Sequence, residues 1–373
     1  MANSSIERIF TVNLGVKPDE KVIVFTDIID SAEKLTVKER ERRDDLRDFA
    51  KDVAEEGRKF CTTEFIEYPA PGEHGCEPPE PLWEAAFGIG AVGDLNEAGI
   101  LMKLLDKKAD DADVRQAEEI VKKHNVRTCD AVIALSNFST SHTRFRDLLT
   151  KIKGARYASM PLFERSMLGG PMTADWHKVE KRTLGLVKMF KDGQTVFITT
   201  PNGTSISFSI KGRELQPDTG ILTKPGTFGN LPAGEAFLAP VEGSAEGTLI
   251  LEWAPTGKLR HPVELTVKGG RVVKVSGKGN FVKYLQDMIE NNPLCGNIAE
   301  LGIGTNEKAK RPDNILETEK ILGTVHIALG DNSSFGGKVS VPFHEDFIFY
   351  RPTLEVIKGE EKIEILVDGK ARF

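Results

Sequence analysis

The pattern of apolar and polar positions changes along the chain, and the change predicts two differently built parts. Up to about residue 190, short apolar runs alternate with segments whose apolar residues recur every three or four positions. The first run is typical of a buried parallel strand, and the charged segment after it has the spacing of an amphipathic helix. We expect strands at 22–27, 60–68, 131–135 and 155–160, and helices at 37–59, 79–105, 113–124 and up to residue 152. This order predicts an α/β domain with a mainly parallel sheet over residues 1–190.

Beyond residue 190, closely spaced strands replace this alternation. Strands at 195–200 and 205–210 flank the turn Pro201-Asn202-Gly203-Thr204, which is typical of a hairpin. Further strands are expected at 247–253, 263–267, 272–275 and 354–367, with one helix at 280–291. Residues 191–373 are therefore predicted to form a β-rich α+β domain.

The composition narrows the class of protein. Hydrophobic residues make up 39% and charged residues 28% of the 373 residues, which is ordinary for a globular protein. A net charge of −6 argues against a nucleic acid or an anionic membrane as the main partner. The chain has no apolar run long enough to span a membrane and no signal-peptide pattern at its start, so we expect a cytoplasmic protein. Its four scattered cysteines fit a reducing compartment.

Two polar or glycine-rich stretches in the first part resemble ligand sites. Gly88, Gly90 and Gly93 match the G-x-G-x-x-G string, but the residues before them have a helical pattern where a dinucleotide site requires a strand. We therefore reject a nucleotide site. Residues 139–141, Ser-Thr-Ser, follow a predicted strand and precede a helix, where they could hold an anionic group or simply cap the helix.

The richest set of candidate metal ligands lies near the C-terminus. His326 follows a β-branched run, and a Gly/Asp/Asn/Ser loop separates it from His344-Glu345-Asp346. Residues two apart in a strand point to the same face, so His344 and Asp346 can reach one ion while Glu345 points away. A single histidine on an apolar strand is more often structural, but the neighbouring pair favours a metal site.

Two glutamates upstream extend this set. Glu235 follows the Pro-Ala-Gly turn at 232–234, which can aim a carboxylate, although a solvent-exposed loop glutamate would look the same. Glu300 has the apolar neighbours Ile298, Ala299, Leu301 and Ile303, and a carboxylate in such company is costly unless it is paired or bound to metal. Five ligands are too many for one tetrahedral ion with an open position and fit a pair of ions.

These motifs resemble the metal-binding motifs of the aminopeptidase T family, the thermophilic-type leucyl aminopeptidases. The matching stretches are NLPAGE at 230–235, AELGIGTN at 299–306, HIALG at 326–330 and His344-x-Asp346, and the stretches at 131–143 and 158–161 are also similar. The resemblance implies a cytoplasmic homodimeric metalloaminopeptidase with two divalent ions (Zn, Co or Mn). By it, Glu235, Glu300, His326, His344 and Asp346 would be ligands, and Glu300 is our candidate for a catalytic role.

Two features of the sequence keep other functions open. The tyrosine that the family has seven residues after its first histidine is Ser333 here, and Tyr350 is a candidate replacement. The two histidines are also closer together than in the family. The motifs resemble those of the dihydroxypyridine dioxygenases of the same fold as well, in which His326, His344 and Asp346 would hold one Fe(II) that opens an aromatic ring. A third alternative is a metal-binding protein without peptidase activity.

Overall fold

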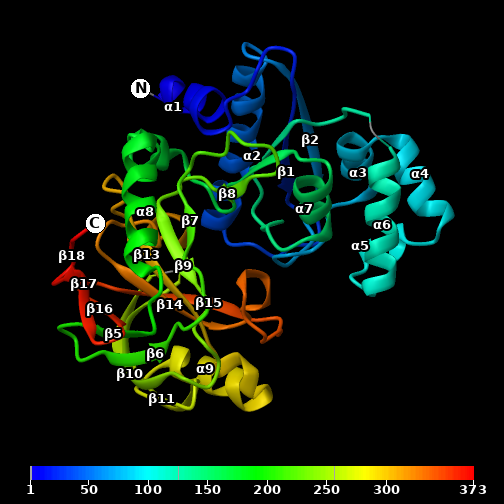
Figure 1. Cartoon of the computed structure of the whole chain (residues 1–373). Helices are drawn as coiled ribbons and strands as arrows, with labels where there is room; N and C mark the ends of the chain where they lie inside the picture. The colour runs from blue at the N-terminus through cyan, green and yellow to red at the C-terminus, as the bar shows by residue number, and fades with distance from the viewer. Residues whose placement is uncertain (1, 125, 256) are drawn as a thin grey trace. The chain divides into compact units, whose positions relative to one another are not determined.

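The computed structural model describes residues 2–124, 126–255 and 257–373, which form two compact units (Figure 1). The first unit comprises Met1–Trp176 and Gly220–Pro232, and the second comprises His177–Thr219 and Ala233–Phe373. The predicted fold class, a mainly parallel α/β part followed by a β-rich part, is confirmed. The division into domains at residues 1–190 and 191–373 stays a prediction.

The first unit contains a five-stranded parallel sheet in the order β2-β1-β3-β4-β8. Six of the eight residues of β1 are buried, as its apolar sequence predicts. The strands of the sheet are β1 (Lys21–Ile28), β2 (Thr62–Pro69), β3 (Ala131–Ala134), β4 (Arg156–Ser159) and β8 (Phe228–Asn230).

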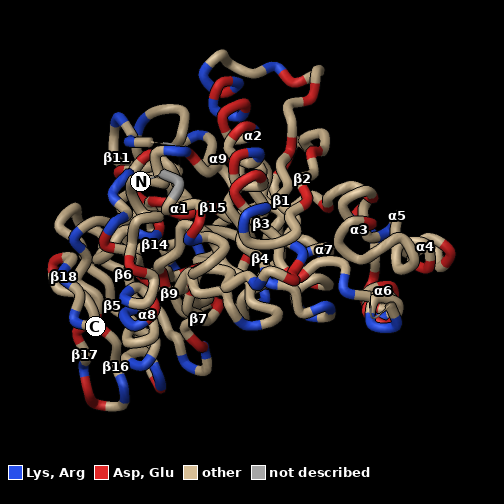
Figure 2. The backbone as a smooth tube through the Cα atoms, turned by 90° about the horizontal axis from the view of Figure 1, so that it is seen from above, with Lys and Arg blue, Asp and Glu red and all other residues tan. Residues whose placement is uncertain are grey.

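Helices and short helical turns connect these strands. Helix α2 buries Leu46, Phe49, Ala50 and Val53, and Figure 2 shows acidic and basic residues interspersed along it, so its predicted amphipathic pattern is confirmed. The helical segments are α1 (Ala2–Arg8), η1 (Ile9–Asn13), α2 (Val37–Gly57), α3 (Glu80–Phe87), α4 (Ile89–Glu97), α5 (Leu101–Leu105), α6 (Asp111–Lys123), α7 (Arg144–Asp147), η2 (Leu148–Ile152), η3 (Arg165–Gly169) and η4 (Pro171–Thr173).

The second unit contains two antiparallel sheets. The eight-stranded sheet has the order β12-β11-β10-β6-β5-β16-β17-β18, and the five-stranded sheet has the order β15-β14-β13-β9-β7. One cluster of buried residues draws on both, including Val196 and Leu249 from the first and Leu301 and Ile327 from the second, so the sheets share one apolar core.

The eight-stranded sheet corrects one predicted element. Residues 354–367 form two antiparallel strands rather than one, because the chain turns at Gly359, whose φ is +60°. Its strands are β5 (Thr195–Thr199), β6 (Ser205–Ser209), β10 (Glu246–Ala254), β11 (Gly257–Lys268), β12 (Arg271–Ser276), β16 (Thr353–Lys358), β17 (Glu361–Val367) and β18 (Lys370–Ala371).

The five-stranded sheet carries the candidate ligands. Its strands are β7 (Gln216–Asp218), β9 (Glu235–Leu238), β13 (Ile298–Gly304), β14 (Val325–Gly330) and β15 (His344–Phe349). The remaining helical segments are α8 (Trp176–Phe190), α9 (Asn280–Asn291), η5 (Pro293–Gly296), α10 (Ile315–Thr318) and η6 (Ser333–Phe335). None of the helices in the described part of the chain has both the length and the apolar character that crossing a bilayer requires.

Candidate metal centre

One face of the five-stranded sheet presents all five candidate ligands. Residues directly opposite one another in an antiparallel sheet point to the same face. Glu300 of β13 stands opposite Ala328 of β14, which stands opposite Asp346 of β15. By the same pairing the face also carries three residues opposite glycines: His326 opposite Gly302, Glu235 opposite Gly304, and His344 opposite Gly330.

The alternate residues of these strands point into the apolar core. Leu301 and Ile303 of β13, Ile327 of β14 and Phe347 of β15 all belong to the core cluster. A slip of one residue in any strand would bury the charged side chains in that core, so the register is strongly specified. The fold therefore fixes the direction of each candidate ligand.

Gly302 provides the space that the imidazole of His326 occupies. A Cβ atom at position 302 would lie 1.9 Å from Nε2 of His326, closer than any real contact. The histidine ring thus lies across the β13 backbone, and only glycine fits beneath it.

Glu300 lies between the two histidines. Its Oε1 is 3.4 Å from Nε2 of His326, and its Oε2 is 3.4 Å from Nε2 of His344. Beyond these contacts, Nε2 of His326 is 3.5 Å from Oε2 of Glu235, and Nε2 of His344 is 3.6 Å from Oδ2 of Asp346. The structure therefore brings the five predicted residues into one continuous set of contacts.

Three of these residues have the geometry of a metal site. Glu300, His344 and Asp346 each offer one ligand atom, and the three atoms lie within 4.8 Å of one another. Nδ1 of His344 lies 2.7 Å from the carbonyl oxygen of Asp331 and can only donate to it, which leaves Nε2 free to bind a cation. Within the described residues, Oδ1 of Asp346 is buried without a hydrogen-bond partner. An imidazole nitrogen and two carboxylates suit a divalent cation, so these residues fit a bound metal ion.

His326 differs from His344 in the surroundings of its second ring nitrogen. Its Nδ1 is buried and has no hydrogen-bond partner among the described residues, whereas a metal-bound imidazole usually donates its second nitrogen to an acceptor. Of the two histidines, His344 is thus the one held in the tautomer and orientation of a metal ligand.

The charges of the centre compensate one another. Burial lowers the pKa of His326, but Glu300 and Glu235 outweigh it and raise that pKa to about 9. Burial raises the pKa of Asp346, but His344 outweighs it, so the net pKa is lowered. For Glu235, burial outweighs the attraction of Lys320 and raises the pKa to about 8. Several acidic groups in one buried place make the site suitable for a cation.

Lys320 is a functional candidate that the sequence analysis missed. Its side chain is 0% exposed, and its Nζ lies 2.6 Å from Oε1 of Glu235 and 2.9 Å from Oε2 of Glu319. Lys320 thereby fixes one oxygen of Glu235 and turns the other toward His326. In sequence, a Glu-Lys pair is typical of solvent-exposed surface, so nothing there signals its burial.

The two residues that mark the departure from the aminopeptidase pattern are engaged elsewhere. The hydroxyl of Ser333 donates to Oδ1 of Asp331 at 3.0 Å. The ring of Tyr350 lies against Trp253, with centroids 6.1 Å apart, and burial raises the pKa of its hydroxyl to about 12.

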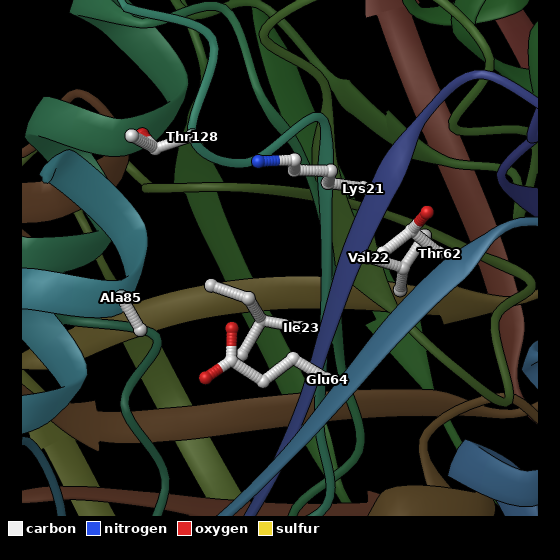
Figure 3. Close-up of a pocket in the computed structure, with 7 residues that line it drawn as sticks. All are labelled: Lys21, Val22, Ile23, Thr62, Glu64, Ala85 and Thr128. Atoms are coloured by element: carbon white, nitrogen blue, oxygen red, sulfur yellow. The ribbon is translucent and has the colours of Figure 1, made fainter.

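The ligand-like stretches of the first unit have structural roles. Gly90 and Gly93 lie inside α4, and helix α3 precedes them where a dinucleotide site requires a strand. Thr140 bonds to the hydroxyl of Tyr157, and Ser141 bonds to that of Ser159. The pocket in Figure 3 is lined only by residues of this unit, Lys21, Val22, Ile23, Thr62, Glu64, Ala85 and Thr128, and includes none of the candidate ligands.

Comparison with known proteins favours one of the functions that these motifs left open. A family model described as 2,5-dihydroxypyridine 5,6-dioxygenase matches residues 106–365, well over half of the chain and all of the candidate ligands. The chain belongs to this family. It is 24% identical over 183 residues to the 2,5-dihydroxypyridine 5,6-dioxygenase of Pseudomonas putida, a match that covers 45% of this chain and about half (52%) of that relative.

Solved structures agree on the fold. A 2,5-dihydroxypyridine dioxygenase from Pseudomonas putida superposes with a TM-score of 0.70 at 17% identity, over 99% of this chain and 96% of that one. Wild-type AmpT from Thermus thermophilus superposes with a TM-score of 0.59 at 14% identity, over 100% and 99% of the two chains. At these identities the likeness shows the fold alone.

The predicted metalloaminopeptidase activity is therefore wrong. The family match and the curated relative indicate a dioxygenase. The predicted classes hydrolase, leucyl aminopeptidase and metalloprotease are therefore wrong as well. The prediction was wrong because the motifs at Glu235, Glu300 and His326 specify only a charged face of a sheet, and proteins with different activities share this fold. Such a face can hold a cation for hydrolysis or for oxidation, so it does not fix the reaction.

Proposed function

We propose that this protein is an iron(II)-dependent dioxygenase that opens a dihydroxylated pyridine ring. The observation that carries the proposal is the family match across residues 106–365, because that segment contains the entire charged face of the five-stranded sheet. The substrate class follows from the name of the family, and 2,5-dihydroxypyridine is the first compound to test.

Glu300, His344 and Asp346 are the residues that we assign to the ion. Their ligand atoms lie within 4.8 Å of one another, and three protein ligands leave further coordination positions for small molecules. Bound iron(II) supplies the electron-transfer chemistry that lets ground-state oxygen react with an electron-rich ring. The sequence-based alternative assigned the ion to His326, His344 and Asp346. The set proposed here has Glu300 instead of His326.

His326 and Glu235 then act on protons beside the ion. Nε2 of His326 lies within 3.5 Å of both Glu300 and Glu235, so it can hold a proton between two carboxylates and pass it to or from a substrate oxygen. Lys320 keeps Glu235 in place through its 2.6 Å ion pair. In the reaction the C5–C6 bond breaks and both atoms of one O2 enter the product, so no external reductant is consumed.

The test uses protein loaded with Fe(II) without oxygen and then mixed with 2,5-dihydroxypyridine in buffer that contains oxygen. We expect one O2 consumed for each ring lost, no turnover with Zn(II), and none by the Asp346→Ala variant with Fe(II). A wild-type protein that binds iron and leaves the ring intact would overturn the proposal.

Two predictions from the sequence remain part of this proposal. We retain a homodimer, which sedimentation velocity at micromolar concentration tests directly. We also retain a cytoplasmic location, in keeping with the four free cysteines at 61, 76, 129 and 295.

A further inference from the structure

Two phenylalanines stand beside the candidate metal centre, one on the same sheet face and one on a loop. Phe237 follows Glu235 by two residues on β9 and stands opposite Gly302. Phe335 comes from η6, in the loop between β14 and β15. The two rings meet edge to face, with centroids 5.8 Å apart and planes at 79°. Phe335 also meets the imidazole of His344 at 5.9 Å and 89°, so it touches a residue that we assign to the ion.

The loop that carries Phe335 is held at several points. Gln216 donates from Nε2 to the carbonyl oxygen of Phe335 at 3.3 Å, which ties the tip of the loop to β7. Oδ1 of the buried Asn332 accepts from the backbone N–H of Val339 at 2.9 Å. A Cβ atom at Gly337 would lie 1.9 Å from Cγ of Asn332, so glycine is required for the loop to close over that side chain. Polar contacts thus fix the position of Phe335 without help from its own ring.

The exposure of the two rings suggests a role beyond packing. Both phenylalanines are only partly buried, while Ala236 and Leu238, which flank Phe237 on β9, are fully buried in the core. Aromatic rings prefer edge-to-face or offset stacking at centroid distances of roughly 4.5–7 Å, and such contacts select planar ligands. A pyridine ring with a hydroxyl directed at the ion beside His344 would lie next to Phe335.

We propose that Phe335 and Phe237 form the subsite that receives the aromatic ring of the substrate. This inference rests on the proposed function and makes it specific, because it names the residues that favour a planar ring over an aliphatic metal-binding compound. Phe335 contributes most, since it contacts both Phe237 and His344.

The test measures binding of 2,5-dihydroxypyridine to Zn(II)-loaded protein by equilibrium dialysis without oxygen, so that no turnover is needed. We expect Phe335→Ala to weaken ring binding roughly tenfold and Phe335→Leu to give an intermediate value. Zn(II) affinity and the affinity for acetohydroxamate, an aliphatic metal ligand, should stay unchanged. The matched control is Phe197→Ala, which removes a phenyl group that is 43% exposed on β5 of the same unit and should leave ring binding as in the wild type.

The outcomes separate the two proposals. Equal ring affinity in wild type and Phe335→Ala would overturn the subsite while leaving the dioxygenase intact. Parallel loss of Zn(II) and ring binding in both Phe335 variants would also overturn it, since it would show that the ring only supports the ligand loop. A wild-type protein that neither binds nor oxidises 2,5-dihydroxypyridine would overturn the proposed function and the subsite with it.

Discussion

Replacing Lys320 by methionine tests whether the charged face depends on this buried ammonium group. The substitution keeps the apolar length of the side chain and removes its charge. It leaves Glu235 and Glu319 without their cation, although their side chains are only 6% and 14% exposed. Removal of one partner from a buried ion pair costs about 3–5 kcal/mol. At about 2–4 °C per kcal/mol for a domain of 150–250 residues, the melting temperature should fall by roughly 6–20 °C.

The pH dependence of this loss has a definite sign. Burial raises the pKa of Glu235 to about 8 even with Lys320 present, and removal of the ammonium raises it further. A carboxyl group whose folded pKa lies above its unfolded value costs stability as the pH rises from the unfolded to the folded pKa, and the cost is complete above the folded pKa. Wild type therefore reaches its full cost near pH 8, whereas the Lys320→Met variant continues to lose stability above pH 8. The variant should be closer to wild type at pH 7 than at pH 9.

Thermal unfolding of metal-free protein, followed by circular dichroism at both pH values, measures this effect. Glu235→Gln and Glu319→Gln added to Lys320→Met should recover part of the loss, because neutral amides need no counter-ion. As a control, Lys362→Met removes a 57% exposed lysine that pairs with Glu355, and should cost no more than about 1 kcal/mol. A melting temperature for Lys320→Met that equals that of the control at pH 9 would refute the reasoning.

Two further substitutions test the ion site and the glycine that lies beneath the His326 ring. Wild-type protein should bind one Fe(II) per chain, measured by metal analysis, and its melting temperature should rise when the ion binds. The His344→Ala variant should neither bind the ion nor show the rise in melting temperature. Full metal occupancy in His344→Ala would count against our ligand set. Gly302→Ala places a Cβ 1.9 Å from Nε2 of His326, so it should displace the imidazole, cost about 1–3 kcal/mol by urea unfolding and slow turnover. Gly185→Ala is the control, since no atom outside its chain neighbours and the backbone of its own helix lies within 4 Å of a Cβ there, and an equal effect of both substitutions would contradict the packing argument.

Local pattern predicts most of the strands and the direction of the ligands. The spacing of His344 and Asp346 places them on one face because β15 is a regular strand, and the apolar neighbours of Glu300 mark its alternate residues as core. Gly302 carries a signal that the sequence analysis did not use, since a glycine inside an apolar strand often marks a close approach.

Long-range contacts account for what the sequence analysis missed. Lys320 lies 85 positions from Glu235, and its burial depends on how the chain between β13 and β14 folds back. The meeting of Phe335 with Phe237 depends in the same way on the path of a loop. The reaction itself was misjudged for another reason: the side chains that hold a cation are common to several chemistries, and the neighbouring residues that select among them are not arranged in a local pattern.

Isotope labelling tests the central claim most directly, that the face formed by Glu300, His344 and Asp346 supports ring cleavage by a dioxygenase. Fe(II)-loaded protein and 2,5-dihydroxypyridine are mixed under oxygen-18 gas, and the mass of the product is measured by mass spectrometry. Our account predicts a ring-opened product that contains both atoms of one labelled O2 molecule. A product that takes its new oxygen from water, or a ring recovered unchanged from the iron-loaded protein, would contradict it.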